Sequence, residues 1–274
     1  MNLFRTRLIQ LGALFSILRR FENPFLIILL RLGILKTPYF PYRIRNNGKN
    51  FTMLARPTTT SMADLFVLRE VLVEEAYEEV LAFLNGNGLR VVDIGANLGS
   101  FTIWLHHKVG LREAYCFEPE PDSFRLLQFN LSKNDCSFAR ALPFAVGGEE
   151  RTAEISLTES SPGASSIYRS QKPQPFATTI RVASFEQWLK GIEGSFDLLK
   201  MDCEGAEWEI IQRTDAKQLR RFKVFVAEVH GDPLKKAAIA DFKPFMEAIG
   251  FRTIRWDAHA QGLYMAVRDS KNVQ

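Results

Sequence analysis

The apolar positions beyond residue 88 fall into short runs separated by amphipathic stretches. The runs are typical of buried strands, and they cover residues 90–94, 114–117, 141–146, 196–201 and 224–229. The stretches between them favour helices, expected from about residue 101, over 122–133, from about 206 and over 232–249. This alternation predicts an α/β domain over residues 89–270 with a mostly parallel, doubly wound sheet.

Two segments depart from this alternation. The last two strands, residues 251–256 and 263–267, are joined too tightly for a helical crossover, so that pair is predicted to be antiparallel. Over about residues 151–182 the pattern changes to two strands, 153–157 and 179–182, around a loop rich in Ser, Gly and Pro. This β insertion is expected either to shape a substrate pocket or to form a surface hairpin.

The first 45 residues carry a helical pattern of their own. Large apolar residues recur at steps of three and four from Phe4 to Leu18, which places them on one helix face. Asn23 and Pro24 are typical of a helix start and predict a second helix to about residue 35. We expect a basic amphipathic extension over 1–45, and then a linker and a pre-domain helix, residues 63–84, within 46–88.

Charge separates this extension from the rest of the chain. The 274 residues carry a net charge of +4, but residues 1–45 hold eight basic side chains and one acid, a net +7, which leaves −3 for the remainder. A nucleic-acid-binding body is disfavoured, because neutralising phosphates needs clustered positive charge. Three cysteines exclude a disulfide framework and favour a reducing, cytoplasmic compartment.

Two interpretations of residues 1–36 remain open. The helices could bury their apolar faces against the body or a second copy of the chain. Alternatively, they could lie on an anionic membrane surface as a peripheral contact, with arginines at the headgroups. No uncharged run approaches the ~20 residues that a membrane span needs.

The most informative turn follows the first predicted strand of the domain. Asp93 ends the strand, Gly95 and Gly99 allow a close backbone approach to a ligand, and Glu118 ends the next strand, where a carboxylate can accept ribose hydroxyls. The spacing G-x-x-x-G differs from the dinucleotide fingerprint, and Asp93 would repel a pyrophosphate. A ligand with an ammonium group and no phosphate, such as S-adenosylmethionine, suits Asp93 better, either directly or through a backbone-bound water.

Acidic residues gather after two later strands. Asp202, Glu204 and Glu207 follow the strand 196–201, and Glu228 and His230 end the strand 224–229. Acids in such a turn can simply favour a helix N-terminus. As a site, His230 is the first candidate for a general base, with Asp202 or Glu204 as alternatives. The run lacks a diagnostic ligand spacing, so no metal is predicted.

Four segments in this order carry a family resemblance. They are Val92-Asp93-Ile94-Gly95-Ala96-Asn97-Leu98-Gly99, Phe117-Glu118-Pro119, Leu199-Lys200-Met201-Asp202-Cys203-Glu204-Gly205-Ala206-Glu207 and Glu228-Val229-His230. The chain from about 89 to 268 resembles the FkbM family of S-adenosylmethionine-dependent methyltransferases. Residues 66–77 also resemble the segment that often precedes this domain.

The resemblance implies a Rossmann-like class I methyltransferase fold and O-methylation of a hydroxyl on a sugar, polyketide or other small-molecule or glycan acceptor. It assigns the cofactor loop to Asp93, Gly95, Asn97 and Gly99 and the ribose acid to Glu118. It also implies that Phe144 and Ala145 flank the adenine.

Two other functions stay open at this stage. One is an NAD-dependent oxidoreductase on a similar sheet, which the glycine spacing disfavours. The other is a non-catalytic, membrane-associated cofactor-binding module, because a fold does not by itself determine a function.

Overall fold

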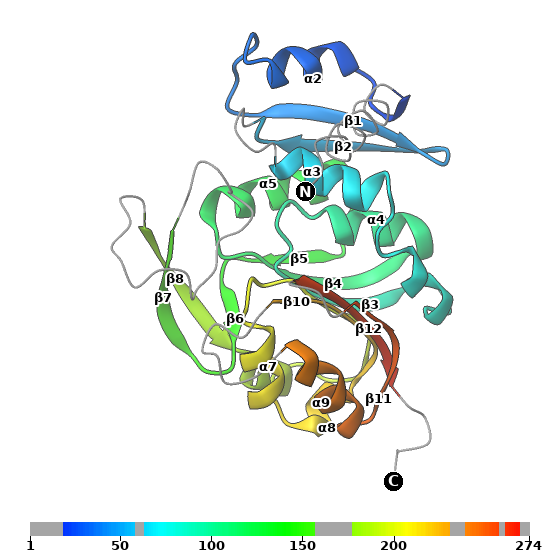
Figure 1. Ribbon diagram of the computed structural model, residues 1–274, viewed down its shortest axis with the longest axis vertical. Helices are drawn as coiled ribbons and strands as arrows, with labels where there is room; N and C mark the ends of the chain where they lie inside the picture. Colours follow the sequence, from blue (N-terminus) through cyan, green and yellow to red (C-terminus); the bar gives the residue numbers. More distant parts are fainter. Residues whose placement is uncertain (1–18, 58–62, 157–176, 231–238, 258–260, 269–274) are drawn as a thin grey trace.

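A seven-stranded sheet forms the centre of the computed structural model, which describes residues 19–57, 63–156, 177–230, 239–257 and 261–268 (Figure 1). Its strand order is β11-β12-β10-β9-β3-β4-β5. The strands are β3 (Leu89–Ile94), β4 (Leu111–Phe117), β5 (Ala139–Leu142), β9 (Phe196–Met201), β10 (Phe222–His230), β11 (Phe251–Trp256) and β12 (Gln261–Arg268).

The pairing confirms the predicted fold class. Strands β10, β9, β3, β4 and β5 are joined by parallel pairs, and β12 runs antiparallel to both β10 and β11. The chain builds β3, β4 and β5 toward one edge and then returns to place β9 on the other side of β3. The strand order therefore reverses between β3 and β9, which is where open α/β sheets bind ligands.

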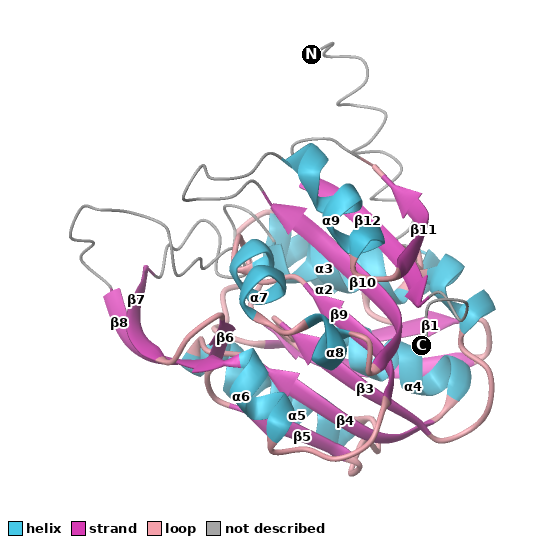
Figure 2. Ribbon diagram, turned by 90° about the horizontal axis from the view of Figure 1, so that it is seen from below, coloured by secondary structure: helices cyan, strands magenta, loops and turns pink. Residues whose placement is uncertain are grey.

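Successive strand residues face two different cores. Val91 and Leu198 pack into the core beneath α4 (Ser100–Val109) and α5 (Pro121–Lys133). Val92 and Leu199, their neighbours in sequence, pack into the opposite core. That core is covered by α6 (Phe185–Lys190), α7 (Glu207–Arg213), α8 (Ala216–Leu219) and α9 (Phe242–Ala248), which lie together on one face in Figure 2. Burial on both faces explains why these strands are almost uniformly apolar.

The predicted strand 141–146 is wrong as one element. The chain leaves the main sheet after β5, and β6 (Ala145–Gly147) pairs with β8 (Ala177–Ser184), which also pairs with β7 (Arg151–Ser156). Pro143 lies at the break, and proline has no N–H to continue a ladder. The two strands of the insertion, β7 and β8, thus form a three-stranded sheet together with β6. In Figure 2, β7 and β8 extend away from the main sheet.

A hairpin stands where the sequence predicts a linker. Strands β1 (Phe40–Asn46) and β2 (Lys49–Ala55) pair in antiparallel register around Asn47 and Gly48, both with positive φ. Asn-Gly is the strongest short-range hairpin signal. Alternate residues such as Tyr42 and Met53 are fully buried, so the hairpin is part of the core.

The helices before the domain are shorter than predicted. α2 (Pro24–Arg31) begins as expected after Asn23, whereas the expected helix from Phe4 to Leu18 lies outside the described residues. The single helix expected over 63–84 is two pieces, α3 (Ala63–Leu72) and a 3-10 helix, η1 (Glu78–Phe83). Glu75 adopts a left-handed conformation between them, which interrupts a helix. None of the described helices is both long and apolar enough to cross a bilayer.

Two asparagines on α5 join the hairpin to the domain. Asn130 Oδ1 accepts the Leu54 N–H at 2.7 Å, and its amide donates to the Leu54 carbonyl. One turn later, Asn134 pairs in the same way with the N–H and carbonyl of Thr52. These amides satisfy the free edge of β2, which would otherwise leave backbone groups unpaired.

Candidate active site

A cavity of about 350 Å³ opens at the carboxyl ends of β3, β4, β9 and β10, beside the reversal in strand order. Its walls come from the loop after β3, the ends of the other three strands, β6, and the N-terminal helix α3. The volume lies within the range of about 300–1,000 Å³ that small-molecule sites occupy. Parts of the chain on both sides of the predicted domain boundary therefore build this pocket.

The glycines of the loop after β3 serve backbone packing. Gly95 has a φ of +77°, and a Cβ there would collide with the Asp202 carbonyl oxygen. Gly99 has a φ of +83°, and a Cβ there would lie 2.8 Å from Leu127 on α5. Gly95 lines the cavity together with Asn97, whereas Gly99 does not. The loop can therefore lie flat against β9 and α5 only with glycine at these positions.

Asp93 lies beneath the loop and does not line the cavity. It is fully buried, accepts a hydrogen bond from Thr102 Oγ1 at 2.8 Å, and lies 3.4 Å from Lys200 Nζ. Lys200 donates to the Gly95 carbonyl at 2.9 Å and does line the cavity. Asp93 thus holds Lys200, and Lys200 holds the loop, so Asp93 acts on the cavity through Lys200 and the loop backbone.

Glu118 faces the cavity from the end of β4. Its two carboxylate oxygens accept the backbone N–H groups of Asn97 and Glu120, each at 2.9 Å. Burial raises the pKa of Glu118 to about 7, although the two backbone hydrogen bonds oppose that shift. Each oxygen keeps a lone pair, so Glu118 can still accept hydroxyl groups.

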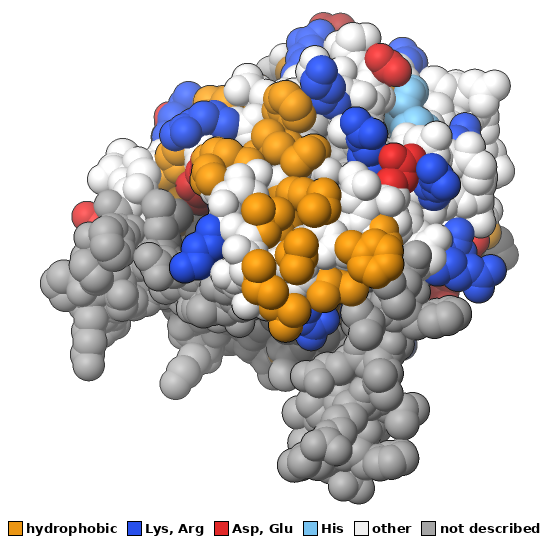
Figure 3. All heavy atoms as spheres, turned by 90° about the horizontal axis from the view of Figure 1, so that it is seen from above, with side chains coloured by type: hydrophobic (Ala, Val, Ile, Leu, Met, Phe, Trp, Pro, Cys, Tyr) orange, Lys and Arg blue, Asp and Glu red, His pale blue; other side chains and the backbone are white. Residues whose placement is uncertain are grey.

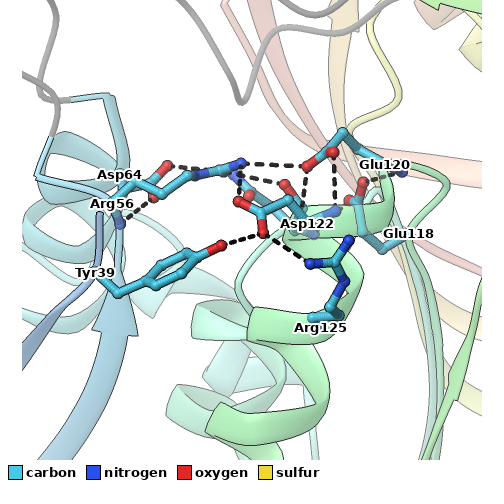
Figure 4. A network of polar contacts seen from close by, with 9 residues as sticks. Tyr39, Arg56, Asp64, Glu118, Glu120, Asp122 and Arg125 are labelled. Atoms are coloured by element: carbon cyan, nitrogen blue, oxygen red, sulfur yellow. Dashed lines mark hydrogen bonds and ion pairs between the residues drawn. The ribbon is translucent and has the colours of Figure 1, made fainter. Parts of the chain in front are cut away.

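A network of charged groups supports Glu118 from the N-terminal side (Figure 4). Arg56 follows β2 and pairs with Asp64 at 3.0 Å and with Glu120 at 3.2 Å. Glu120 in turn caps α5 by accepting the N–H groups of Asp122 and Ser123. The segment before the domain is therefore connected, through Glu120, to the carboxylate predicted to bind ribose.

The acidic turn after β9 is organised by Glu207. This fully buried carboxylate accepts the N–H groups of Cys203 at 2.9 Å and Gly205 at 3.0 Å. Glu207 Oε1 also lies 3.1 Å from His230 Nδ1. The sequence suggests only that Glu207 favours the start of a helix. In the fold, Glu207 connects the turn after β9 to His230 at the end of β10.

His230 reaches the same turn from β10. Its Nε2 lies 3.8 Å from Glu204 Oε2, and both side chains line the cavity. Burial lowers the pKa of His230, but the hydrogen bond to Glu207 and the charges of Glu207, Asp202 and Glu204 outweigh it and raise the pKa to about 9. His230 is therefore an imidazolium near neutral pH.

A second polar group joins Glu228 to two residues that the sequence analysis did not select, Glu70 and Tyr77. Tyr77 donates from its hydroxyl to Glu228 Oε1 at 2.6 Å, and Glu70 on α3 lines the cavity with both. Burial, followed by the charges of Glu228 and Asp202, raises the pKa of Glu70 to about 7. The resemblance of residues 66–77 to a segment preceding the family domain was the one available signal.

The fold thus brings most of the predicted site together. The cavity is lined by the predicted site residues Gly95, Asn97, Glu118, Ala145, Asp202, Glu204 and His230. Phe144 does not line it and packs instead against Phe117, with 5.4 Å between ring centroids. No described residue of β7 or β8 lines it either. Among the described residues, no group of three or more His, Cys, Asp or Glu side chains is arranged to hold a metal ion.

Residues 93–253, more than half of the chain, match the family described as the Methyltransferase FkbM domain. The protein belongs to this family. The comparison confirms the resemblance inferred from the motifs and the Rossmann-like class I methyltransferase fold. It does not support the alternative of an NAD-dependent oxidoreductase.

Two curated proteins are similar over most of their length. "Methyltransferase 1" of Beauveria bassiana (strain ARSEF 2860) is 24% identical over 222 residues, which cover 74% of this chain and 86% of that protein. "Methyltransferase sdnD" of Sordaria araneosa is 24% identical over 193 residues, covering 60% of this chain and 73% of that protein.

Among solved structures, the FkbM methyltransferase from Methylobacillus flagellatus KT superposes with a TM-score of 0.48 and 15% identity. The match covers 75% of this chain and 54% of that chain.

S-adenosylmethionine is the methyl donor of this FkbM methyltransferase, and the cavity suits it. Among the described residues, the cavity is lined by more acidic than basic side chains, so its walls favour a cationic ligand. The acids are Glu70, Glu118, Asp202, Glu204 and Glu228, and the bases are Lys200 and His230. Asn97 Oδ1 is buried and has no hydrogen-bond partner among the described residues, which leaves an acceptor for a ligand. Glu118 lines the same cavity and can still accept hydroxyl groups.

Proposed function

We propose that this FkbM methyltransferase transfers a methyl group to a hydroxyl oxygen of a small acceptor. The observation that carries the proposal is the group formed by Glu70, Tyr77 and Glu228 in the same cavity as Glu118. A hydroxyl acceptor needs hydrogen-bond acceptors that orient it and a base that removes its proton. These side chains supply both functions within one pocket.

The residues have separate tasks in this proposal. S-adenosylmethionine supplies an electrophilic methyl carbon on its sulfonium, so much of the acceleration comes from positioning. Asn97 and Glu118 bind on the cofactor side, with Gly95 and Gly99 shaping the loop and Lys200 holding it. Ala145 lines the adenine side, as the resemblance implies.

The proton acceptor that we favour is Glu70. A catalytic base is most effective when its pKa lies near the working pH, and the pKa of Glu70 is raised to about 7. His230, the first candidate from the sequence, already carries a proton near neutral pH, since its pKa is about 9. Protonated His230 can instead donate a hydrogen bond, while Glu207, followed by Asp202 and Glu204, keeps it charged.

The wall built by α3 indicates the type of acceptor. Ala63, Phe66, Val67 and Val71 line the cavity beside Glu70. An acceptor with its hydroxyl on a hydrocarbon frame, of the polyketide type, would bury its apolar part against this wall. A free sugar would leave these side chains without an apolar partner.

The pH dependence of methyl transfer tests the base. With Glu70 as the base, kcat/KM rises with pH to a plateau above about 7, whereas a His230 base would give a rise centred near 9. Glu70→Gln should lower kcat/KM at pH 8 by about 100-fold or more and leave S-adenosylhomocysteine affinity unchanged.

Glu78→Gln is the matched control, because Glu78 is exposed and lies outside the cavity, and it should leave turnover unchanged. Unchanged turnover in Glu70→Gln would contradict the role of Glu70. Tight S-adenosylhomocysteine binding without turnover, across a panel of apolar alcohols and sugars, would instead favour the non-catalytic cofactor-binding module.

A further inference from the structure

The outer face of α2 is apolar although its inner face already has a partner. Ile27 and Leu30 are 1% exposed and pack into the core against the hairpin. Phe25, Leu29 and Leu32 follow at steps of four and three on the outer side, with Phe25 74% and Leu32 66% exposed. Packing against the described residues therefore accounts for only one of the two apolar faces.

These side chains belong to a larger surface that we term the α2 patch. It consists of Phe25, Leu26, Leu29, Leu32, Ile34 and Tyr39. Figure 3 shows apolar side chains gathered on this face, with Lys and Arg side chains around them. A contiguous exposed apolar surface of this kind marks a site of contact with another protein or with a membrane.

The positive charge around the α2 patch restricts the kind of partner that can bind there. Residues 19–45 contain six basic side chains and one acid, Glu22, a net charge of +5. Glu22 is paired with Arg43 and Arg45, whereas Arg31 and Lys36 are exposed. The sequence continues this character toward the N-terminus, where Arg5 and Arg7 accompany the apolar helical pattern.

We propose that the α2 patch docks on an anionic lipid surface. A bilayer with acidic headgroups offers apolar depth for Phe25, Leu29 and Leu32 and negative charge for the basic side chains around them. In a symmetric dimer, by contrast, the patch would face its own copy and bring two basic surfaces together. The exposed apolar side chains and the basic side chains around them thus both favour an anionic lipid surface.

Vesicle flotation of the full chain tests this proposal. The protein should float with vesicles containing about 30% phosphatidylserine and remain unbound with phosphatidylcholine alone, and about 0.5 M salt should weaken the binding. Phe25→Ser combined with Leu32→Ser should lower the affinity for the anionic vesicles at least about tenfold, because each loses an exposed apolar anchor.

Phe129→Ser is the matched control, because Phe129 is an exposed phenylalanine on α5 outside the α2 patch. It should bind vesicles like the wild-type protein. Light scattering of the same proteins without lipid measures whether each is a monomer or a dimer. The proposal is overturned if the wild type does not bind anionic vesicles, if the double variant binds as well as the wild type, or if the wild type is a dimer that the double variant dissociates. S-adenosylhomocysteine binding should be the same in all three proteins.

Discussion

At the scale of single residues, buried charged groups organise the site from below its surface. Asp93 is the clearest case, because it was expected to attract a cationic ligand directly or through a bound water, and it is paired with Lys200 under the loop. The positive charge of Lys200 then fixes the Gly95 carbonyl. Glu207 acts in the same way on the turn after β9. In both places a carboxylate shapes backbone that a ligand can approach.

The pair of His230 and Glu207 gives the first prediction at this scale. The pKa of His230 is raised from 6.5 to about 9 in the folded protein, so its contribution to stability is fully present below pH 6.5 and is lost as the pH rises through 9. His230→Gln, which keeps a neutral donor, should lower the free energy of unfolding by about 1.5–3 kcal/mol at pH 6.

Urea unfolding of both proteins at pH 6 and at about pH 10 measures this effect. Since other titrating groups are shared, the difference between wild type and variant isolates His230. That difference should shrink toward zero at the higher pH. A difference that is independent of pH would mean that His230 gains no proton on folding.

At the scale of elements, the N-terminal segment and the domain are joined by side chains that bind backbone. Asn130 and Asn134 cover the free edge of β2, and Arg56 links the end of β2 to the start of α5 through Glu120. The start of α5 also contains the support for Glu118. Residues before the matched family domain are therefore connected to Glu118 in the wall of the cavity.

Arg56 offers a direct test of this connection. Arg56→Lys keeps the positive charge but loses the forked contacts to Asp64 and Glu120. Without them, Glu120 and the backbone around Glu118 are held less firmly, so S-adenosylhomocysteine affinity should fall by about tenfold.

Calorimetric titration measures the change in affinity. The control is Arg45→Lys, which alters an arginine paired with Glu22 on the surface, and it should bind normally. If a folded Arg56→Lys protein bound S-adenosylhomocysteine as tightly as the wild type, the contacts of Arg56 would not support the cofactor site.

At the scale of the whole molecule, the hairpin and the domain share one core. Tyr42 and Met53 from the hairpin belong to the same cluster of buried residues as Val91 and Leu198 from the main sheet. The sheet of β6, β7 and β8 has its own small cluster of four buried residues, Ala145, Ile155, Ile180 and Val182. The two peripheral sheets should therefore differ in stability.

Native-state hydrogen exchange checks this expectation. The slowest amides of β1 and β2 should open with about the same free energy as those of β3, because opening the hairpin exposes the shared core. The amides of β7 should open at a lower free energy. Equal, low protection in both peripheral sheets would show that the hairpin folds independently of the domain.

The amino-acid sequence by itself determined the sheet and most of the residues that gather at one of its edges. Buried parallel strands must be apolar on both faces. The strands β3, β4, β9 and β10 can therefore be recognised in the sequence as short apolar runs. The turns after them carry Gly95, Asn97, Glu118 and His230, and parallel strands bring such turns to one edge. Local pattern and topology agree in these segments, and the prediction of the strands and of the edge where these turns meet is confirmed.

The tertiary structure alone decided which groups face the ligand and what supports them. Whether Asp93 points into the cavity or beneath the loop depends on Lys200, which lies 107 positions further on and meets it only across paired strands. The role of Glu70 depends on where α3 packs, and the hairpin depends on amides from α5. Such choices arise from burial and from distant partners, which no local pattern of residues contains.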